Sequence, residues 1–115
     1  MPGGYANQAR MTISTSGTGT FTLSAAVAPF NTFATAGVID QEVVPYGAID
    51  GTVGSEKGWG LYSAAGPTLT RNVFISTNTN NPINASSSNT QVFIDPSVAD
   101  LIQLSLTAHA NLGGL

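Results

Sequence analysis

Hydrophobic and polar residues alternate along much of the chain, with the period of two that is typical of β-strands. In residues 11–27, MTISTSGTGTFTLSAAV, Met11 and Ile13 share one side of a first run. Phe21 and Leu23 share one side of a second run, and the turn-like SGTG separates the two. The β-branched threonines between them suit the solvated face of a strand. The pattern therefore predicts a β-hairpin.

A second strand signal covers residues 42–50, EVVPYGAID, and leads into the turn-rich DGTVGSEKG. Pro45 lies inside this run and has no N–H to donate to a neighbouring strand. We therefore predict an edge strand or a bulge at Pro45. Glycines in the following segment supply the positive-φ positions that turns require.

A second hairpin is predicted between residues 58–64 and 68–76, around Ala65-Gly66-Pro67. Period two places four residues of its second strand on one face, namely Leu69, Arg71, Val73 and Ile75. An arginine thus falls among apolar neighbours in a chain with only three basic residues.

The remaining segments are connections and one further strand. Residues 28–40 read as an irregular connection in which Phe30 and Phe33 plug the core. The polar, low-complexity TNTNNPINASSSN at 77–89 is predicted to be a loop. TQVFI at 90–94 is predicted to be a final core strand.

These elements predict an all-β fold, because the strands follow one another without helical crossovers of about 10–15 residues. We expect a single antiparallel β-sandwich or barrel-like domain over residues 11–95. Residues 1–10 are expected to form a flexible N-terminal arm and 96–115 a C-terminal extension or arm. Within the extension, 97–107 fits a helical turn or a strand, and the pattern leaves both open.

Composition narrows the function classes. A chain of 115 residues with 42% hydrophobic and only 8% charged residues forms one domain whose surface is polar but weakly charged. Three scattered cations and a net charge of −3 argue against a nucleic-acid partner. No apolar run approaches the roughly 20 residues that cross a bilayer, and the N-terminus lacks a signal-peptide core. With no cysteine, disulfides and thiolate metal sites are excluded.

Catalytic and metal chemistry find little support in the sequence. The single histidine, His109, lies near the C-terminus and is read as an exposed tail residue, and no serine lies in a GxSxG motif. A cluster of acids in sequence lacks the alternating pattern of an EF-hand loop; its members are Asp40, Glu42, Asp50 and Glu56. We predict no enzyme activity, no metal and no cofactor.

Two groups of residues remain as candidate sites. Arg71 is predicted to form a structural ion pair, with Glu56 and Asp50 as its candidate partners; the alternative is a contact with another subunit. Trp59, Tyr62 and Tyr46 could form an aromatic surface on which a sugar stacks, or they could belong to the core or an interface.

The order of short motifs resembles small structural modules of tailed bacteriophages over residues 11–95. The motifs, each weak alone, are SGTGTFTL (16–23), PFNTF (29–33), VPYGAIDG (44–51), Glu56, GWGLY (58–62), TLTR (68–71), STNTNN (76–81) and VFI (92–94). Two departures stand out. Ser55 precedes Glu56 where such modules tend to carry tryptophan, with Trp59 nearby, and 96–115 replaces a long fibre shaft.

The resemblance implies a virion structural protein, assembled in the host cytoplasm. We expect a small capsid decoration, head-fibre or tail-accessory protein that adheres to other virion proteins, and a homo-oligomer, with a trimer favoured. The alternative is a carbohydrate-binding module of a tail fibre that contacts a host glycan. Neither role involves nucleic acid or a membrane.

Overall fold

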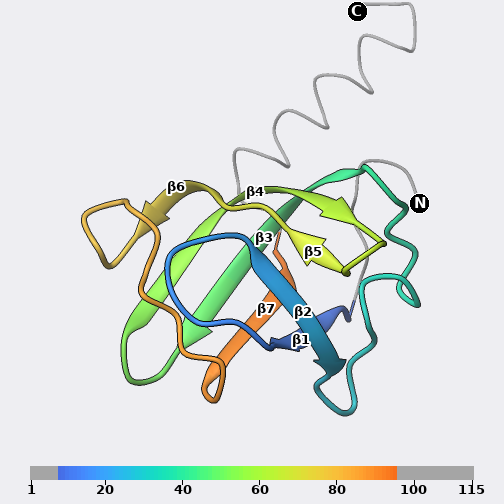
Figure 1. Cartoon of the computed structure of the whole chain (residues 1–115), viewed down its shortest axis with the longest axis horizontal. Coiled ribbons are helices and arrows are strands. Elements are labelled where there is room, and N and C mark those ends of the chain that lie inside the picture. The colour runs from blue at the N-terminus through green and yellow to red at the C-terminus, as the bar shows by residue number, and fades with distance from the viewer. Residues whose placement is uncertain (1–7, 96–115) are drawn as a thin grey trace, which may run out of the picture.

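The computed structural model describes residues 8–95, and this part of the chain is entirely β-structure (Figure 1). Its seven strands are β1 (Arg10–Ile13), β2 (Phe21–Ala26), β3 (Val43–Asp50), β4 (Gly54–Ser63), β5 (Thr68–Leu69), β6 (Asn72–Ser76) and β7 (Thr90–Ile94). The predicted all-β, single-domain fold is confirmed. Between residues 8 and 95 there is no helix, and so none that is long and apolar enough to cross a membrane.

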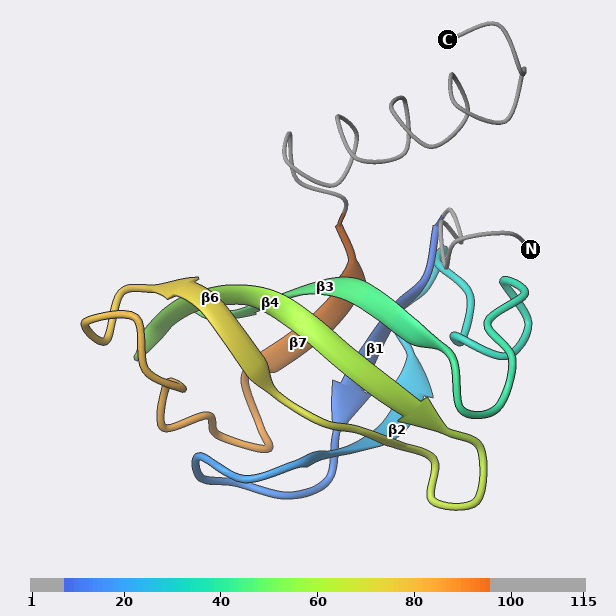
Figure 2. The same cartoon turned by 90° about the horizontal axis from the view of Figure 1, so that it is seen from above.

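The strands form one antiparallel sheet that closes on itself. Its order is β3-β7-β1-β2-β5-β4-β6, and β3 also pairs with β4 along its whole length. Six strands therefore form a closed ring. β6 pairs with Glu56–Trp59 of β4, on the same edge of β4 where β5 pairs with Tyr62 and Ser63; Figure 2 shows β3, β4 and β6 side by side. Closure leaves no free edges within the ring itself.

Alternate residues of the strands fill the barrel. Both predicted hairpins are confirmed, with β1 paired to β2 and β4 paired to β5 and β6. The core consists of Ala9, Met11, Ile13, Phe21, Leu23, Phe33, Val38, Val44, Tyr46, Ala48, Tyr62, Leu69, Ile83, Ala85 and Val92. Phe33 lies in this core as predicted, whereas Phe30 is 38% exposed and lies outside it.

The prediction that β3 is an edge strand or has a bulge at Pro45 is wrong. Pro45 lies one position beyond the β3–β7 ladder, where its carbonyl accepts a hydrogen bond of 3.0 Å from the Asp95 N–H. Another residue at this position would return a hydrogen bond to the Asp95 carbonyl. The Lys57 ammonium donates to that carbonyl instead. Proline is therefore accommodated in a strand that is paired on both sides.

The single face predicted for the second strand of the β4 hairpin also needs correction. Leu69 and the Arg71 side chain are buried as expected. The register then shifts, because Gly58 pairs with Val73 while Lys57 pairs with Ile75. The extra residue, Phe74, forms a bulge. Ile75 consequently lies opposite Lys57 on the outside of the barrel and is 52% exposed.

The connections and termini follow the predictions in part. Residues 77–89 form the predicted loop, but Ile83 and Ala85 within it are buried. Arg10, assigned to the N-terminal arm, begins β1, and its N–H donates to the carbonyl of Asn31. Ala9, also assigned to the arm, is buried in the core and bridges to Asn31, so the prediction of a flexible arm is wrong for Ala9 and Arg10. Residues 1–7 of the predicted arm and all of 96–115, including the helix-or-strand question at 97–107, lie outside the described residues.

Candidate functional site

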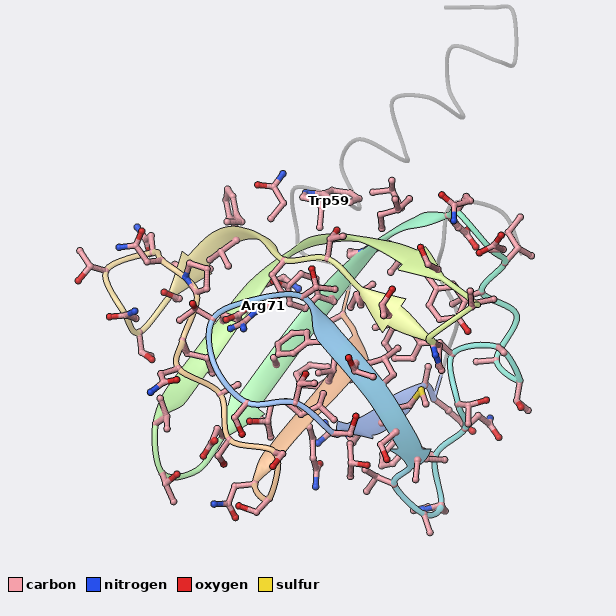
Figure 3. The ribbon with its side chains drawn as sticks, viewed as in Figure 1. Trp59 and Arg71 are labelled. Atoms are coloured by element: carbon pink, nitrogen blue, oxygen red, sulfur yellow. The ribbon has the colours of Figure 1, made fainter. Side chains whose placement is uncertain are left out.

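A buried pair of opposite charges lies inside the barrel, at Arg71. This residue follows β5 and precedes β6, and its side chain points into the space enclosed by the strands (Figure 3). The Arg71 side chain is 2% exposed and that of Glu56, from β4, is fully buried. The two form the predicted ion pair.

The geometry of this pair is bidentate. The Arg71 Nε–H donates to Glu56 Oε2 at 2.9 Å, and Nη2 donates to Glu56 Oε1. The planar guanidinium thus matches the planar carboxylate with two parallel hydrogen bonds. The guanidinium also lies 4.2 Å from the centroid of the Phe21 ring, where the negative face of the ring stabilises the cation.

Backbone carbonyls accept the remaining donors of Arg71. Nη1 donates to the carbonyls of Gly17 at 2.9 Å and Gly19 at 3.0 Å, both in the β1–β2 loop. Nη2 donates to the Ile83 carbonyl at 2.7 Å, in the 77–89 loop. All five N–H donors of the guanidinium therefore have an acceptor.

The carboxylate of Glu56 is equally saturated. Besides Arg71, its Oε1 accepts the Ile83 N–H at 2.9 Å and its Oε2 accepts the Tyr46 hydroxyl at 2.6 Å. Burial, together with the hydrogen bond to Glu56, raises the pKa of Tyr46 far above its ordinary value. The phenol therefore stays protonated and remains a donor.

We call this group the Arg71 cluster: the side chains of Arg71, Glu56 and Tyr46 with the backbone groups that they bind. The cluster ties the β1–β2 loop and the 77–89 loop to β3 and β4. These two loops also pair directly, through reciprocal backbone hydrogen bonds between Gly17 and Ala85. Since every donor and carboxylate oxygen of the ion pair is engaged and hidden from solvent, the cluster acts as structural support for the loops.

Asp50 does not join this pair, although the sequence named it as a candidate partner of Arg71. Its carboxylate lies at the far end of β3 and is 1% exposed. Oδ1 accepts the N–H and hydroxyl of Thr52 at 2.9 and 2.7 Å. Oδ2 accepts the N–H and hydroxyl of Ser86 at 3.0 and 2.8 Å and the hydroxyl of Thr90 at 3.0 Å. Asp50 thus fixes the β3–β4 turn and the start of β7.

Because of these hydrogen bonds, the contribution of Asp50 to the stability of the fold depends on pH. The bonds from Thr52, and then those from Ser86, hold the pKa of Asp50 well below the ordinary value of an aspartate, against the opposing effect of burial. As the pH falls, the Asp50 carboxylate is protonated in the unfolded chain before it is protonated in the folded chain. The stabilisation by Asp50 is therefore complete above about pH 5 and is lost as the pH drops toward the folded-state pKa.

We therefore expect Asp50→Asn to lower the free energy of unfolding by about 2 kcal/mol at pH 7, because charge-assisted hydrogen bonds are lost. The difference from wild type should shrink steadily below pH 4. Urea unfolding of both proteins at pH 7, 4 and 2.5 measures this. A difference that is constant with pH would contradict the role of the ionised carboxylate.

The three candidate aromatic residues do not form a common surface. Tyr46 is fully buried and its ring packs edge-on against Phe21, with centroids 6.0 Å apart. Tyr62 is 3% exposed and packs against Phe33 at 6.0 Å. Only Trp59 reaches the surface, where it is 38% exposed on the outer side of β4 (Figure 3). The predicted aromatic contact surface is thus wrong for both tyrosines.

The other acids of the sequence cluster serve local structure. Asp40 accepts the Ala64 N–H at 2.8 Å and Glu42 accepts the Ile39 N–H at 3.0 Å. Among residues 8–95, no group of three or more His, Cys, Asp or Glu side chains could hold a metal ion. His109 lies outside the described residues.

Sequence reasoning missed Tyr46 and all the backbone groups of the Arg71 cluster, which belong to Gly17, Gly19 and Ile83. Tyr46 could have been found from the β3–β4 hairpin, because Tyr46 and Ala48 lie opposite Gly58 and Glu56 on the inner face. Ile83 gave no signal, since it is one apolar residue in a polar loop. Comparison adds nothing to this picture: no protein-family model, curated protein or solved structure matches the chain.

Proposed function

We propose that this protein is a structural component of a bacteriophage virion, a small capsid decoration, head-fibre or tail-accessory protein that acts by adhesion to other virion proteins. The observation that carries the proposal is the free edge of β6. This strand pairs only with β4 among the described strands, so the other side of its backbone is open to a partner. An unpaired strand edge is a template for pairing with another chain.

The side chains of β6 make this edge adhesive. Phe74 is 64% exposed and Ile75 is 52% exposed, an unusual presentation of large apolar side chains on a strand edge. The Asn80 side chain accepts the Ser76 N–H at 3.1 Å and so covers only one end of the strand. Trp59, opposite Asn72, extends the apolar surface onto β4.

The rest of the molecule supports a structural role. The barrel is closed, its loops are anchored by the Arg71 cluster, and only 8% of its residues are charged. The motif order that resembles phage modules spans the same barrel. Partners of this kind include further copies of the chain, and we favour a trimer. A role in binding host glycan would have to rely on Trp59, since Tyr46 and Tyr62 are buried.

A charge placed on β6 tests the adhesion. We expect Phe74→Asp to weaken binding of the purified protein to virions lacking it by about tenfold or more, since a central apolar anchor contributes at least about 1.4 kcal/mol. The matched control is Ile39→Asp, which replaces a 62% exposed side chain outside β6. Co-sedimentation with particles measures both variants, and equal losses would contradict a role for β6.

Electron cryo-microscopy of the phage particle from whose genome this gene comes would locate the protein. Density that repeats over the shell would make it a decoration protein, and density confined to the tail would make it a tail-accessory protein. Absence from the particle would refute the virion role.

A further inference from the structure

The outer face of the barrel carries a hollow of about 460 Å³ where β3, β4, β6 and β7 meet. We call it the β7 hollow. Its floor and walls include Ile49, Lys57, Ile75, Phe93 and Asp95. Apolar side chains thus surround one ion pair, in which Lys57 Nζ lies 2.9 Å from Asp95 Oδ2.

A single register row crosses this face. It runs through residues that are cross-strand partners on five strands: Ile75, Lys57, Gly47, Phe93 and Arg10. The Phe93 ring lies over β3, since a Cβ added to Gly47 would meet its Cε2 at 2.6 Å. The row therefore ends with Phe93 beside a second cation, Arg10, on β1.

The guanidinium of Arg10 lies within cation–π distance of two aromatic rings. Its centre is 4.5 Å from the Phe93 centroid and 5.2 Å from that of Phe30. Nη1 donates to Gln91 Oε1 at 2.8 Å. The Nε–H is buried and has no acceptor within residues 8–95. A buried, unpaired donor of a charged group is costly and calls for a partner.

The charges of the chain indicate which partner is left for Arg10. The other two basic side chains, Lys57 and Arg71, each pair with a carboxylate. Of the six acidic residues in the sequence, only Asp100 lies outside residues 8–95. None of the five acids within residues 8–95 makes an ion pair with Arg10, so Asp100 is the acid of the segment after β7 that can supply one.

The chain leaves the barrel at this place. The Ile94 N–H donates to the Ala9 carbonyl at 3.3 Å, so the end of β7 lies beside the residue that precedes Arg10. Figure 2 shows the end of β7 next to β3. At up to about 3.4 Å per residue, the chain after Asp95 can bring Asp100 to Arg10. The segment 96–115 has one acid and a series of aliphatic residues: Val98, Leu101, Ile102, Leu104 and Leu106.

We propose that residues 96–115 fold back onto the barrel of the same chain, cover Phe93 and the β7 hollow with their aliphatic side chains, and bring the Asp100 carboxylate to Arg10. The short connection at Asp95 makes this contact intramolecular, which raises the effective concentration of the segment to the millimolar range or above. Burial of apolar surface drives the contact, and the Arg10–Asp100 pair fixes its position. The inference stands independently of the virion role. The segment would cover Ile75, which lines the hollow, but would leave Phe74 and the unpaired backbone edge of β6 free.

A single spin label tests the contact, because the chain has no cysteine of its own. A nitroxide is attached at Gln103→Cys in the full-length protein, and amide NMR intensities are compared before and after reduction of the label. We expect the label to remove most of the intensity at Ile49, Lys57 and Phe93, while Ala65 in the β4–β5 turn keeps its intensity. Equal intensities at all four amides would overturn the proposal.

Two controls make the result specific. Asp100→Lys should clearly reduce the difference between Phe93 and Ala65, since it sets a like charge against Arg10, whereas Asn111→Lys should leave it intact. An unchanged difference in Asp100→Lys would overturn the pairing with Arg10. Mixing spin-labelled protein with isotope-labelled wild type identifies a second copy as the occupant: signal loss at Phe93 in that mixture would overturn the same-chain contact.

Discussion

Replacing Arg71 by methionine is expected to lower the free energy of unfolding by about 3–5 kcal/mol, the range for removing one partner of a buried ion pair. Methionine keeps the apolar stem but removes all five donors. The Glu56 carboxylate, fully buried, would be left with the Tyr46 hydroxyl and the Ile83 N–H alone. Urea unfolding at pH 7 measures the loss.

Two further variants separate the contribution of the buried pair from a general effect of charge removal. Lys57→Met removes a cation whose partner, Asp95, is 46% exposed, and should lower stability by about 1 kcal/mol or less. The double variant Arg71→Met with Glu56→Leu should not recover wild-type stability. An ion pair that bonds only to itself can be replaced by apolar residues, but here the backbone groups of both loops would remain unsatisfied. A stability for Arg71→Met equal to that of wild type would contradict the structural role of the cluster.

The strands were predictable because their signals are local. Period-two alternation and turn residues predict β7 and both hairpins without knowledge of the rest of the chain. The alternation of inward-facing and outward-facing residues along β3 and β4 also determines where two aromatic side chains lie. Tyr46 lies in step with Val44 and Ala48, and Tyr62 lies in step with Glu56, so these tyrosines face the interior.

The predictions that were wrong are those in which a residue outside the segment changed the structure expected from its local pattern. Pro45 was expected at an edge, but the Lys57 ammonium bonds the Asp95 carbonyl that the proline cannot reach. Ile75 was expected to face inward, but the one-residue bulge at Phe74 turns it outward. Neither effect can be read from the segment in which it occurs.

The sequence predicted that Arg71 forms an ion pair, but only one of the two acids named as candidate partners is in the pair. With three basic residues in the chain, an arginine on an apolar strand face calls for an acid, and Glu56 was correctly named. Asp50 also lies shortly upstream of Arg71, but β3 carries it toward Ser86 and Thr90. Distance along the chain could not separate the two acids, whereas the register of the β3–β4 hairpin does.

The same register leads to the second large effect, at Gly58. This β4 residue lies on the inner face of the barrel, between Glu56 and Gly60 and opposite the bulge in β6. A Cβ added here would lie 2.2 Å from the Asn72 carbonyl oxygen and 2.9 Å from the Val73 Cα. Both atoms belong to the backbone, so no side-chain rotation can relieve the overlap. The absence of a side chain at Gly58 is what allows the segment bearing Arg71 to approach β4.

We expect Gly58→Ala to lower the free energy of unfolding by about 3 kcal/mol, at the upper end of the range for overpacking a core. Since the segment must move outward, the guanidinium of Arg71 is drawn away from Glu56, and part of the loss comes from the ion pair. Gly51→Ala is the matched control, because no heavy atom lies within 4 Å of its added Cβ, and should change stability by less than about 0.5 kcal/mol. Combining Gly58→Ala with Arg71→Met should then destabilise by less than the sum of the two. Full additivity in urea unfolding would show that the close approach at Gly58 does not position Arg71.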